Sequence, residues 1–207
     1  MSAQSQPSVS TNGLTPEQYL EIERAAEFRS EFYNGRMYAM SGGSYAHFQI
    51  IGNLTGELHT ALKGRPCSVG PSELRVRIAP SRLYTYPDVI VICGEPRFAD
   101  DHKDTLLNPT LIVEVLSPST EAYDRGFKSA QYRTLESLQE YVLVSQAEPR
   151  VEVFRRQSAG HWLLSEAIGL DAVCRFESLD CGVRLADAYD RVTFPAADEA
   201  LSVRPAG

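Results

Sequence analysis

Residues 109–116 read PTLIVEVL, and residues 86–93 read YPDVIVIC. Both stretches are strand-length runs rich in apolar and β-branched residues, which is typical of strands buried on both faces. Side chains alternate along a strand, so Glu114 shares a face with Ile112 and Leu116. We therefore expect a central strand of an α/β domain in which one carboxylate interrupts an apolar face.

The same strand-like pattern recurs along the chain. A hairpin is predicted over residues 30–40 because Asn34-Gly35 is the strongest short signal for a two-residue turn. Other predicted strands cover residues 66–70, 73–79, 140–145, 150–156 and 161–168.

Four helices are predicted between these strands. Thr15 and Ser44 are N-cap residues for the first two, and apolar residues recur at spacings of three and four in the second. The predicted ranges are about 16–28, 44–64, 120–135 and 185–189.

Length and composition indicate one domain. The chain has 207 residues, 43% of them hydrophobic, and we expect a single domain over residues 14–195. Residues 1–13 have the composition of a disordered leader, and residues 196–207 that of a polar tail. Neither a membrane span nor a signal segment can be identified, so we expect no membrane partner and a cytoplasmic location.

Charge and cysteine usage narrow the function classes. A net charge of −7 argues against a broadly basic surface for nucleic acid, although a local basic patch remains open and bound metal would offset some acidity. The four cysteines, Cys67, Cys93, Cys174 and Cys181, show no CxxC spacing. The sequence thus predicts neither disulfides nor a zinc site.

Glu114 is the most informative single residue. An unpaired buried charge costs several kcal/mol or a large pKa shift, so this carboxylate needs a cation or a strong donor. The structural alternative is a pair with a core arginine. Asp88 follows Pro87 at a strand start, where it would ordinarily be a turn residue. Its importance comes from the expectation that its strand lies beside that of Glu114.

Lys128 falls in the helix predicted after the Glu114 strand. Asp124, Lys128, Tyr132 and Leu135 are spaced by four, four and three residues, so they share one helical face that should meet the sheet. Lys128 is therefore expected to point toward the two carboxylates. In the alternative, it reaches solvent beside Tyr132 and pairs with Asp124.

Two carboxylates and a lysine suit the hydrolysis of a phosphodiester. Oxygen ligands hold Mg²⁺ or Mn²⁺, the metal lowers the pKa of a bound water, and an ammonium offsets developing charge. The chain contains no GxSxG, Walker or Rossmann glycine pattern, which argues against serine hydrolases and nucleotide-binding folds.

The series YPDV, LIVEVLSPST, DRGFK and QYR, preceded by SEFYNGRMYAMSGGSYAH, resembles the Uma-type endonuclease family of the PD-(D/E)xK nuclease superfamily. The resemblance covers residues 15–167. It implies a restriction-endonuclease-like fold, with a central mixed sheet flanked by helices. Pro87-Asp88 matches the PD and Glu114 the acidic (D/E), and the carbonyl of Val115 would add a metal ligand. Leu116 stands where the superfamily has lysine, and Lys128 matches a lysine displaced to the following helix.

Three further residues are weaker candidates for the site. Glu31 resembles an additional acidic position that binds metal in related nucleases, but it could equally be a carboxylate at a hairpin edge. Glu73 could simply pair with Arg75 or Arg77. His47 lies on the apolar face of its helix, where we expect no more than a supporting role.

The leading hypothesis is thus a Mg²⁺-dependent DNA endonuclease, with Mn²⁺ as a substitute, that uses Asp88, Glu114 and Lys128, with Glu31 as a further metal ligand. One alternative is a non-catalytic nucleic-acid-binding or assembly protein with the same fold, and another is a hydrolase of other phosphate esters. A homodimer is expected because a double-strand break commonly needs two active sites. Residues 150–156 and 161–168 are candidates for its interface.

Overall fold

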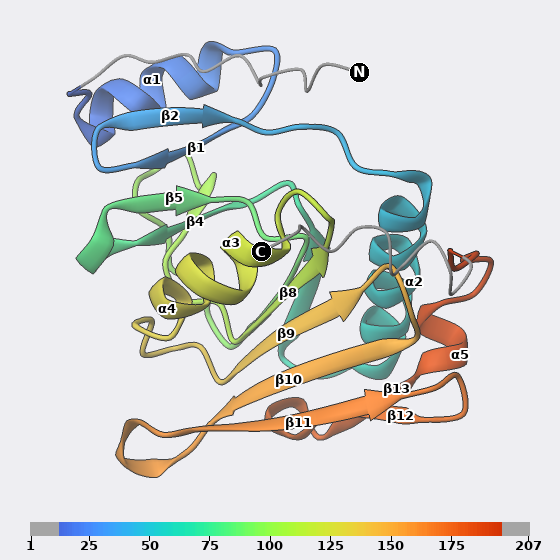
Figure 1. Ribbon diagram of the computed structural model, residues 1–207. Coiled ribbons are helices and arrows are strands. Elements are labelled where there is room, and N and C mark those ends of the chain that lie inside the picture. The colour runs from blue at the N-terminus through green and yellow to red at the C-terminus, as the bar shows by residue number, and fades with distance from the viewer. Residues whose placement is uncertain (1–12, 196–207) are drawn as a thin grey trace, which may run out of the picture.

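The computed structural model describes residues 13–195, which form two larger sheets, a small hairpin and flanking helices (Figure 1). The predicted leader, apart from Gly13, and the predicted tail lie outside the described residues. The sheets contain both parallel and antiparallel strands, so the expected mixed α and β architecture is confirmed.

A six-stranded sheet carries the stretch PTLIVEVL at its centre. In spatial order its strands are β11 (Trp162–Ile168), β10 (Arg150–Arg156), β9 (Glu140–Ser145), β8 (Leu111–Leu116), β6 (Val89–Cys93) and β3 (Cys67–Pro71). β8 pairs in parallel with β9 and antiparallel with β6. All six residues of β8 are buried, so its predicted central position is confirmed.

A five-stranded sheet is built around the predicted hairpin. Its order is β2 (Arg36–Ala39), β1 (Ser30–Tyr33), β5 (Leu83–Thr85), β4 (Arg75–Ile78) and β7 (Thr105–Leu106). Asn34 and Gly35 both have positive φ angles, 47° and 84°, as a two-residue hairpin turn requires. The sequence did not predict β5 and β7, which are too short for a periodic pattern and depend on their neighbours for hydrogen bonds.

Two helices follow their predicted caps. α1 (Pro16–Ala25) starts with a capping box between Thr15 and Gln18, and it ends before the predicted Phe28. α2 (Tyr45–Ala61) starts at Ser44, whose side chain accepts a hydrogen bond from the backbone of the third helical residue. In residues 13–195 we find no helix with the length and apolarity needed to cross a membrane.

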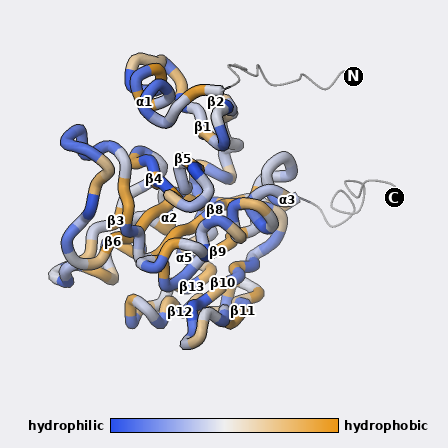
Figure 2. The backbone as a smooth tube through the Cα atoms, turned by 90° about the vertical axis from the view of Figure 1, so that its left-hand side faces the viewer, coloured by the Kyte–Doolittle hydropathy of each residue, from blue (hydrophilic) through white to orange (hydrophobic). Residues whose placement is uncertain are grey.

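The six-stranded sheet has a hydrophobic core on each face. Figure 2 shows the hydropathy of the chain along its backbone. On one face, α2 packs through Ile50, Leu54 and Leu58 against the odd-numbered residues of β8. The small C-terminal unit of β12 (Val173–Phe176), β13 (Cys181–Arg184) and α5 (Leu185–Ala188) joins this core. Of these three elements only α5 was predicted.

The other face carries the helical segment after β8 and residues of the five-stranded sheet. The predicted continuous helix over 120–135 is wrong in detail: α3 (Glu121–Tyr123), a π-helical turn (Asp124–Lys128) and α4 (Ser129–Tyr132) follow one another. The carbonyl of Asp124 accepts a hydrogen bond from the hydroxyl of Tyr141 at 2.9 Å, a tertiary contact at the start of the widened turn. The segment still directs Asp124, Lys128 and Tyr132 inward, since all three are buried.

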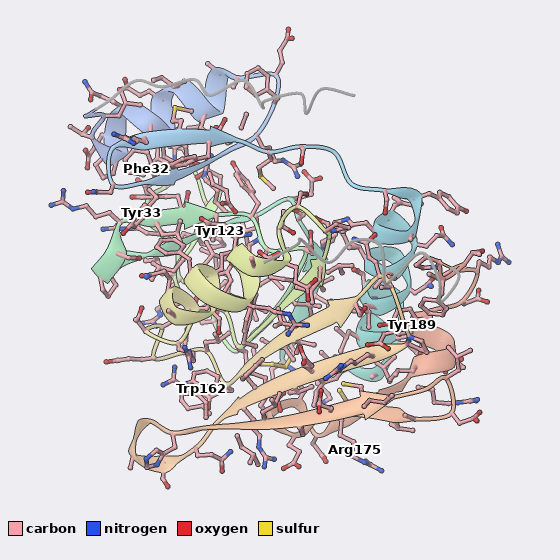
Figure 3. The ribbon with its side chains drawn as sticks, viewed as in Figure 1. Phe32, Tyr33, Tyr123, Trp162, Arg175 and Tyr189 are labelled. Atoms are coloured by element: carbon pink, nitrogen blue, oxygen red, sulfur yellow. A yellow bond between two sulfur atoms is a disulfide. The ribbon has the colours of Figure 1, made fainter. Side chains whose placement is uncertain are left out.

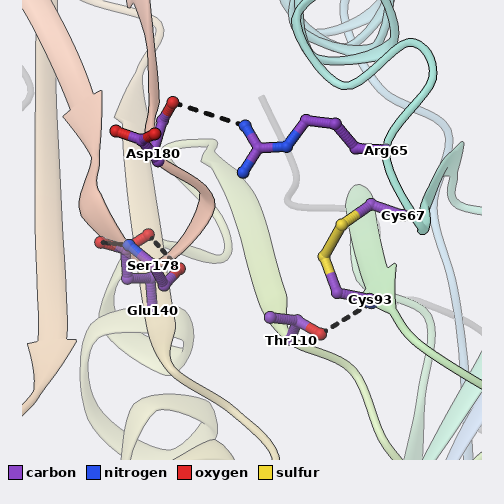
Figure 4. The surroundings of a disulfide bond; sticks show 7 residues. All are labelled: Arg65, Cys67, Cys93, Thr110, Glu140, Ser178 and Asp180. Atoms are coloured by element: carbon purple, nitrogen blue, oxygen red, sulfur yellow. Dashed lines mark hydrogen bonds between the residues drawn. A yellow bond between two sulfur atoms is a disulfide. The ribbon is translucent and has the colours of Figure 1, made fainter.

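The structure corrects the expectation of free cysteines. Cys67 of β3 and Cys93 of β6 form a disulfide (Figure 4). The antiparallel register sets these residues directly opposite each other, with Cα atoms 4.0 Å apart. Sequence spacing did not reveal the pair because only strand pairing brings its members together. Disulfides are rare in the cytoplasm, so this pair argues against the predicted cytoplasmic location. The location itself stays a prediction.

Candidate active site

Asp88 directly precedes β6 and lies next to the strand of Glu114, as predicted. The ladder between β6 and β8 ends at the pair Val89 and Val113. Beyond that point the backbone N–H of Val115 donates to Asp88 Oδ2 at 2.7 Å, in place of a strand partner. The strand end thus presents the Asp88 carboxylate beside the residue that follows Glu114.

Glu114 is only 3% exposed. Its Oε1 accepts hydrogen bonds from Tyr132 Oη at 2.7 Å and from Lys128 Nζ at 3.2 Å, so its partners are not the core arginine of the alternative interpretation. Burial raises the pKa of Glu114 well above its ordinary value, although Lys128 acts in the opposite direction. The carboxyls of Asp124 and Asp88 raise this pKa further. A carboxyl in this position favours a proton or an additional cation.

Lys128 is 6% exposed and points into the fold, as the helical spacing predicts. Its Nζ lies 2.9 Å from Glu31 Oε1, 3.2 Å from Glu114 Oε1 and 3.4 Å from Asp124 Oδ1. Burial acts to lower the pKa of Lys128, but the carboxylates of Glu114 and Glu31 outweigh it and raise the pKa well above its ordinary value. Lys128 is therefore a buried ammonium surrounded by acidic groups.

Glu31 comes from the other sheet. Its strand β1 lies between β2 and β5, so the interpretation as a hairpin-edge carboxylate does not apply. Thr85 donates a short hydrogen bond to Oε1, and the hydroxyl of Tyr123 donates to Oε2 at 3.3 Å. The carboxyl groups of Glu31, Asp88, Glu114 and Asp124, together with Lys128, are named the acidic cluster. It forms where the two sheets and the helical segment meet.

His47 contacts one of the predicted site carboxylates directly, which the sequence did not indicate. Its Nε2 lies 3.2 Å from Asp88 Oδ2. Burial acts to lower the pKa of His47, but Asp88 outweighs it, and the net shift is upward. Glu73, in contrast, lies away from this cluster and pairs with Arg29 rather than with either arginine suggested by the sequence.

The sequence did not predict the roles of four further residues that lie around Lys128 and the carboxylates of the site. Asp124 and Tyr132 stood on the predicted helical face, but only as packing or ion-pair partners. Asp124 Oδ1 is buried and accepts no hydrogen bond from the described residues, and burial raises the pKa of its carboxyl. Thr85 and Tyr123 carry no sequence signal, because their role follows only from their contacts with Glu31.

A cavity of about 830 Å³ is lined by Glu31, His47, Asp88, Glu114, Tyr123, Asp124 and Lys128, among others. Within residues 13–195, no three His, Cys, Asp or Glu side chains are already grouped as metal ligands. The donor chemistry nevertheless fits a hard divalent cation: the carboxylates of Asp88 and Glu114 lie at adjoining strands, and the buried Asp124 Oδ1 has an ion pair with Lys128 but no hydrogen bond from the described residues. A cation of this kind would stabilise the ionised form of the crowded carboxyls.

Comparisons with known proteins identify the fold and the family of this chain. A solved structure, described as a putative nuclease belonging to DUF820 from Anabaena variabilis, superposes with a TM-score of 0.70 at 19% identity and covers 87% of this chain and 99% of its own. The fold is accordingly restriction-endonuclease-like, as expected. Two uncharacterized proteins of Synechocystis sp. are also similar. The protein slr1290 is 41% identical, over 76% of this chain and 82% of its own length, and sll1609 is 39% identical, over 80% and 94%.

The model of one protein family, Uma2, described as "Putative restriction endonuclease", matches residues 16–187. This range contains both larger sheets and every member of the acidic cluster. The chain therefore belongs to the Uma2 family.

Proposed function

We propose that this chain is a metal-dependent DNA endonuclease that hydrolyses phosphodiester bonds. The observation that carries the proposal is the position of Lys128 Nζ between the carboxylates of Glu31 and Glu114, beside the strand end that presents Asp88. The description of the Uma2 family and that of the Anabaena protein support it.

Asp88, Glu114 and the carbonyl of Val115 are the groups that would hold Mg²⁺, with Mn²⁺ as a substitute, and Glu31 would complete the ligand set. When bound, such a cation lowers the pKa of a coordinated water and offsets charge on the phosphate. Oxygen donors of this kind are what both ions prefer.

The protein's own groups would position the reactants. Lys128, held charged by its acidic neighbours, would donate hydrogen bonds to the attacking water or to a phosphate oxygen. The hydroxyl of Tyr132 orients Glu114. The backbone of Val115 and the ring of His47 orient Asp88 from two sides.

The decisive experiment compares Asp88→Asn with the wild type on supercoiled plasmid DNA in Mg²⁺, in Mn²⁺ and in EDTA. The amide keeps an oxygen acceptor for the Val115 N–H but removes the charge, so we expect a folded protein with no metal-dependent nicking. Glu73→Gln is the matched control, because this carboxylate pairs with Arg29 outside the cavity. If the wild-type protein never nicks DNA of any form, the enzyme proposal is wrong.

The same samples separate the alternatives. Calorimetry that detects no Mn²⁺ binding, together with salt-sensitive DNA binding, would favour a non-catalytic nucleic-acid-binding or assembly protein. Turnover of small phosphate esters without DNA cleavage would favour a hydrolase of another class.

A homodimer is part of the proposal, since two sites would cut both strands. β11 supports it, because this edge strand carries exposed Leu163, Leu164 and Ile168. Light scattering should report a dimer for the wild type and a monomer for Leu164→Glu. A wild-type monomer at all concentrations would refute the dimer.

A further inference from the structure

The cavity is lined by four aromatic residues, Tyr33, Tyr38, Tyr123 and Phe127, which we name the aromatic wall. Phe127 lies at its centre: its ring is 4.7 Å from that of Tyr33, edge to face, and 5.3 Å from that of Tyr123, stacked. Tyr33 comes from β1 and Tyr123 from α3 (Figure 3). Tyr38 is 45% exposed and Tyr123 is 36% exposed, so both offer ring surface to a ligand.

The aromatic wall is continuous with the acidic cluster. The hydroxyl of Tyr123 donates to Glu31, and Lys128 Nζ lies 5.6 Å from the centre of the Tyr123 ring. A flat group stacked on Tyr123 would therefore lie next to Lys128. The carboxylates of Glu31, Glu114 and Asp124 are almost fully buried, and the aromatic rings line the same cavity as these groups.

A second hollow of about 450 Å³ adjoins the same aromatic residues. It shares Tyr33 and Tyr38 with the main cavity and is also lined by Asn34 and Arg36. Arg36 is exposed at the start of β2, and a guanidinium binds phosphate through paired donors. The two hollows together thus offer a path with the buried ammonium of Lys128 at one end, aromatic rings in the middle and the exposed guanidinium of Arg36 at the other end.

We propose that this path binds an unpaired nucleic-acid strand, with its bases stacked on the aromatic wall and its backbone running from Lys128 toward Arg36. The inference deepens the proposed nuclease function and rests on it for the identity of the ligand. In a duplex the faces of the bases are covered by their neighbours, so aromatic side chains can reach them only when the bases are unpaired.

Two further observations favour a single strand over a duplex. A cavity of about 830 Å³ is the size of a site for one small molecule, which suits a nucleotide rather than a double helix. The net charge of −7 also limits the affinity that phosphate contacts alone can provide. Stacking would supply affinity that depends less on salt.

The test measures binding of fluorescent oligonucleotides by anisotropy, with an unpaired strand and a duplex of equal length. The protein carries Asp88→Asn, so that no cleavage disturbs the measurement. We expect the unpaired strand to bind more tightly. Tyr123→Leu should weaken its binding about tenfold, within the range measured for loss of one base–aromatic stack. Tyr123→Phe, which loses only the hydroxyl, should keep most of the affinity.

Two variants guard against a trivial loss of folding. Tyr38→Leu removes an exposed ring and should likewise weaken the binding of the unpaired strand. Phe28→Leu is the matched control, because Phe28 is 56% exposed and lies outside the cavity, and it should bind like the parent. Thermal melting confirms that each variant folds.

The outcomes distinguish this inference from the proposed function. Tighter binding of the duplex, or unchanged affinity of Tyr123→Leu for the unpaired strand, overturns the stacking inference and leaves metal-dependent cleavage untouched. Stacking-dependent binding without any cleavage by the wild-type chain keeps the inference and rejects the nuclease.

Discussion

Glu114 and Glu140 are two buried carboxylates on neighbouring parallel strands, and their surroundings differ. In the register of β8 and β9, Glu140 pairs with Leu111 at the start of the strand pair, whereas Glu114 pairs with Leu143 further along it. Both side chains are almost completely buried. Burial therefore does not distinguish them, and the comparison depends on what each carboxylate contacts.

Glu140 is satisfied by neutral donors. Its oxygens accept hydrogen bonds from the backbone of Glu177 at 2.9 Å and from the hydroxyl of Ser178 at 2.7 Å, at the start of a 3₁₀ turn. Figure 4 shows Ser178 beside Glu140. Glu114 instead shares one ammonium with other carboxyls. We conclude that a buried carboxylate bonded to a loop backbone stabilises the fold, whereas one crowded with like charges is a candidate for chemistry.

The largest difference should appear in catalysis. Glu114→Gln is expected to lower metal-dependent DNA cleavage on the order of 100-fold or more, the effect typical of losing one stabilising group in an active site. It should remain folded, because Lys128 keeps Glu31 and Asp124 as partners. Glu140→Gln is the control and should cleave like the wild type. Equal cleavage rates for the two variants would remove the basis of the comparison.

Lys128→Met should have a large effect on stability. It leaves Glu31, Glu114 and Asp124 buried without their shared cation, and breaking a buried ion pair costs about 3–5 kcal/mol. Urea unfolding should show a loss of this size, and added Mg²⁺ should recover part of it. A variant as stable as the wild type would mean that the carboxyls are already protonated.

Ser178→Ala should have a smaller effect, confined to folding. The change removes the hydroxyl that donates to Glu140 and leaves the backbone donors in place. We expect the free energy of unfolding to fall by about 1 kcal/mol, with cleavage unchanged. A loss of cleavage would contradict the assignment of Glu140 to structure alone.

The smallest effect should be a pH dependence at Glu140. Burial raises the pKa of this carboxyl above its ordinary value, while the bonds from Ser178 act in the opposite direction. A raised pKa in the folded state means that folding favours the protonated carboxyl. The contribution of Glu140 to stability is therefore complete below the unfolded-state pKa and is lost as the pH rises through the folded-state pKa. Relative to Glu140→Gln, the wild type should therefore lose stability on going from acidic to neutral pH. If the difference in stability between the wild type and the variant stays constant with pH, or changes with the opposite sign, the hydrogen bonds outweigh burial in their effect on this pKa.

The sequence determined the features that depend on local pattern. The turn at Asn34-Gly35, the helix caps at Thr15 and Ser44 and the buried strand around Glu114 all follow from spacing and conformational preference. The helical spacing also predicted that Lys128 points inward. These features form between residues a few positions apart, so a short segment of the sequence is enough to predict them.

Only the tertiary structure decided which distant residues meet. It brought Glu31 of one sheet to Lys128, joined Cys67 to Cys93, and widened the helix after β8 into a π-helical turn. The aromatic wall likewise combines side chains from strands and helical turns far apart in the chain. Each of these contacts depends on how the sheets stack and pair, and that packing is set by the whole chain at once rather than by any single segment.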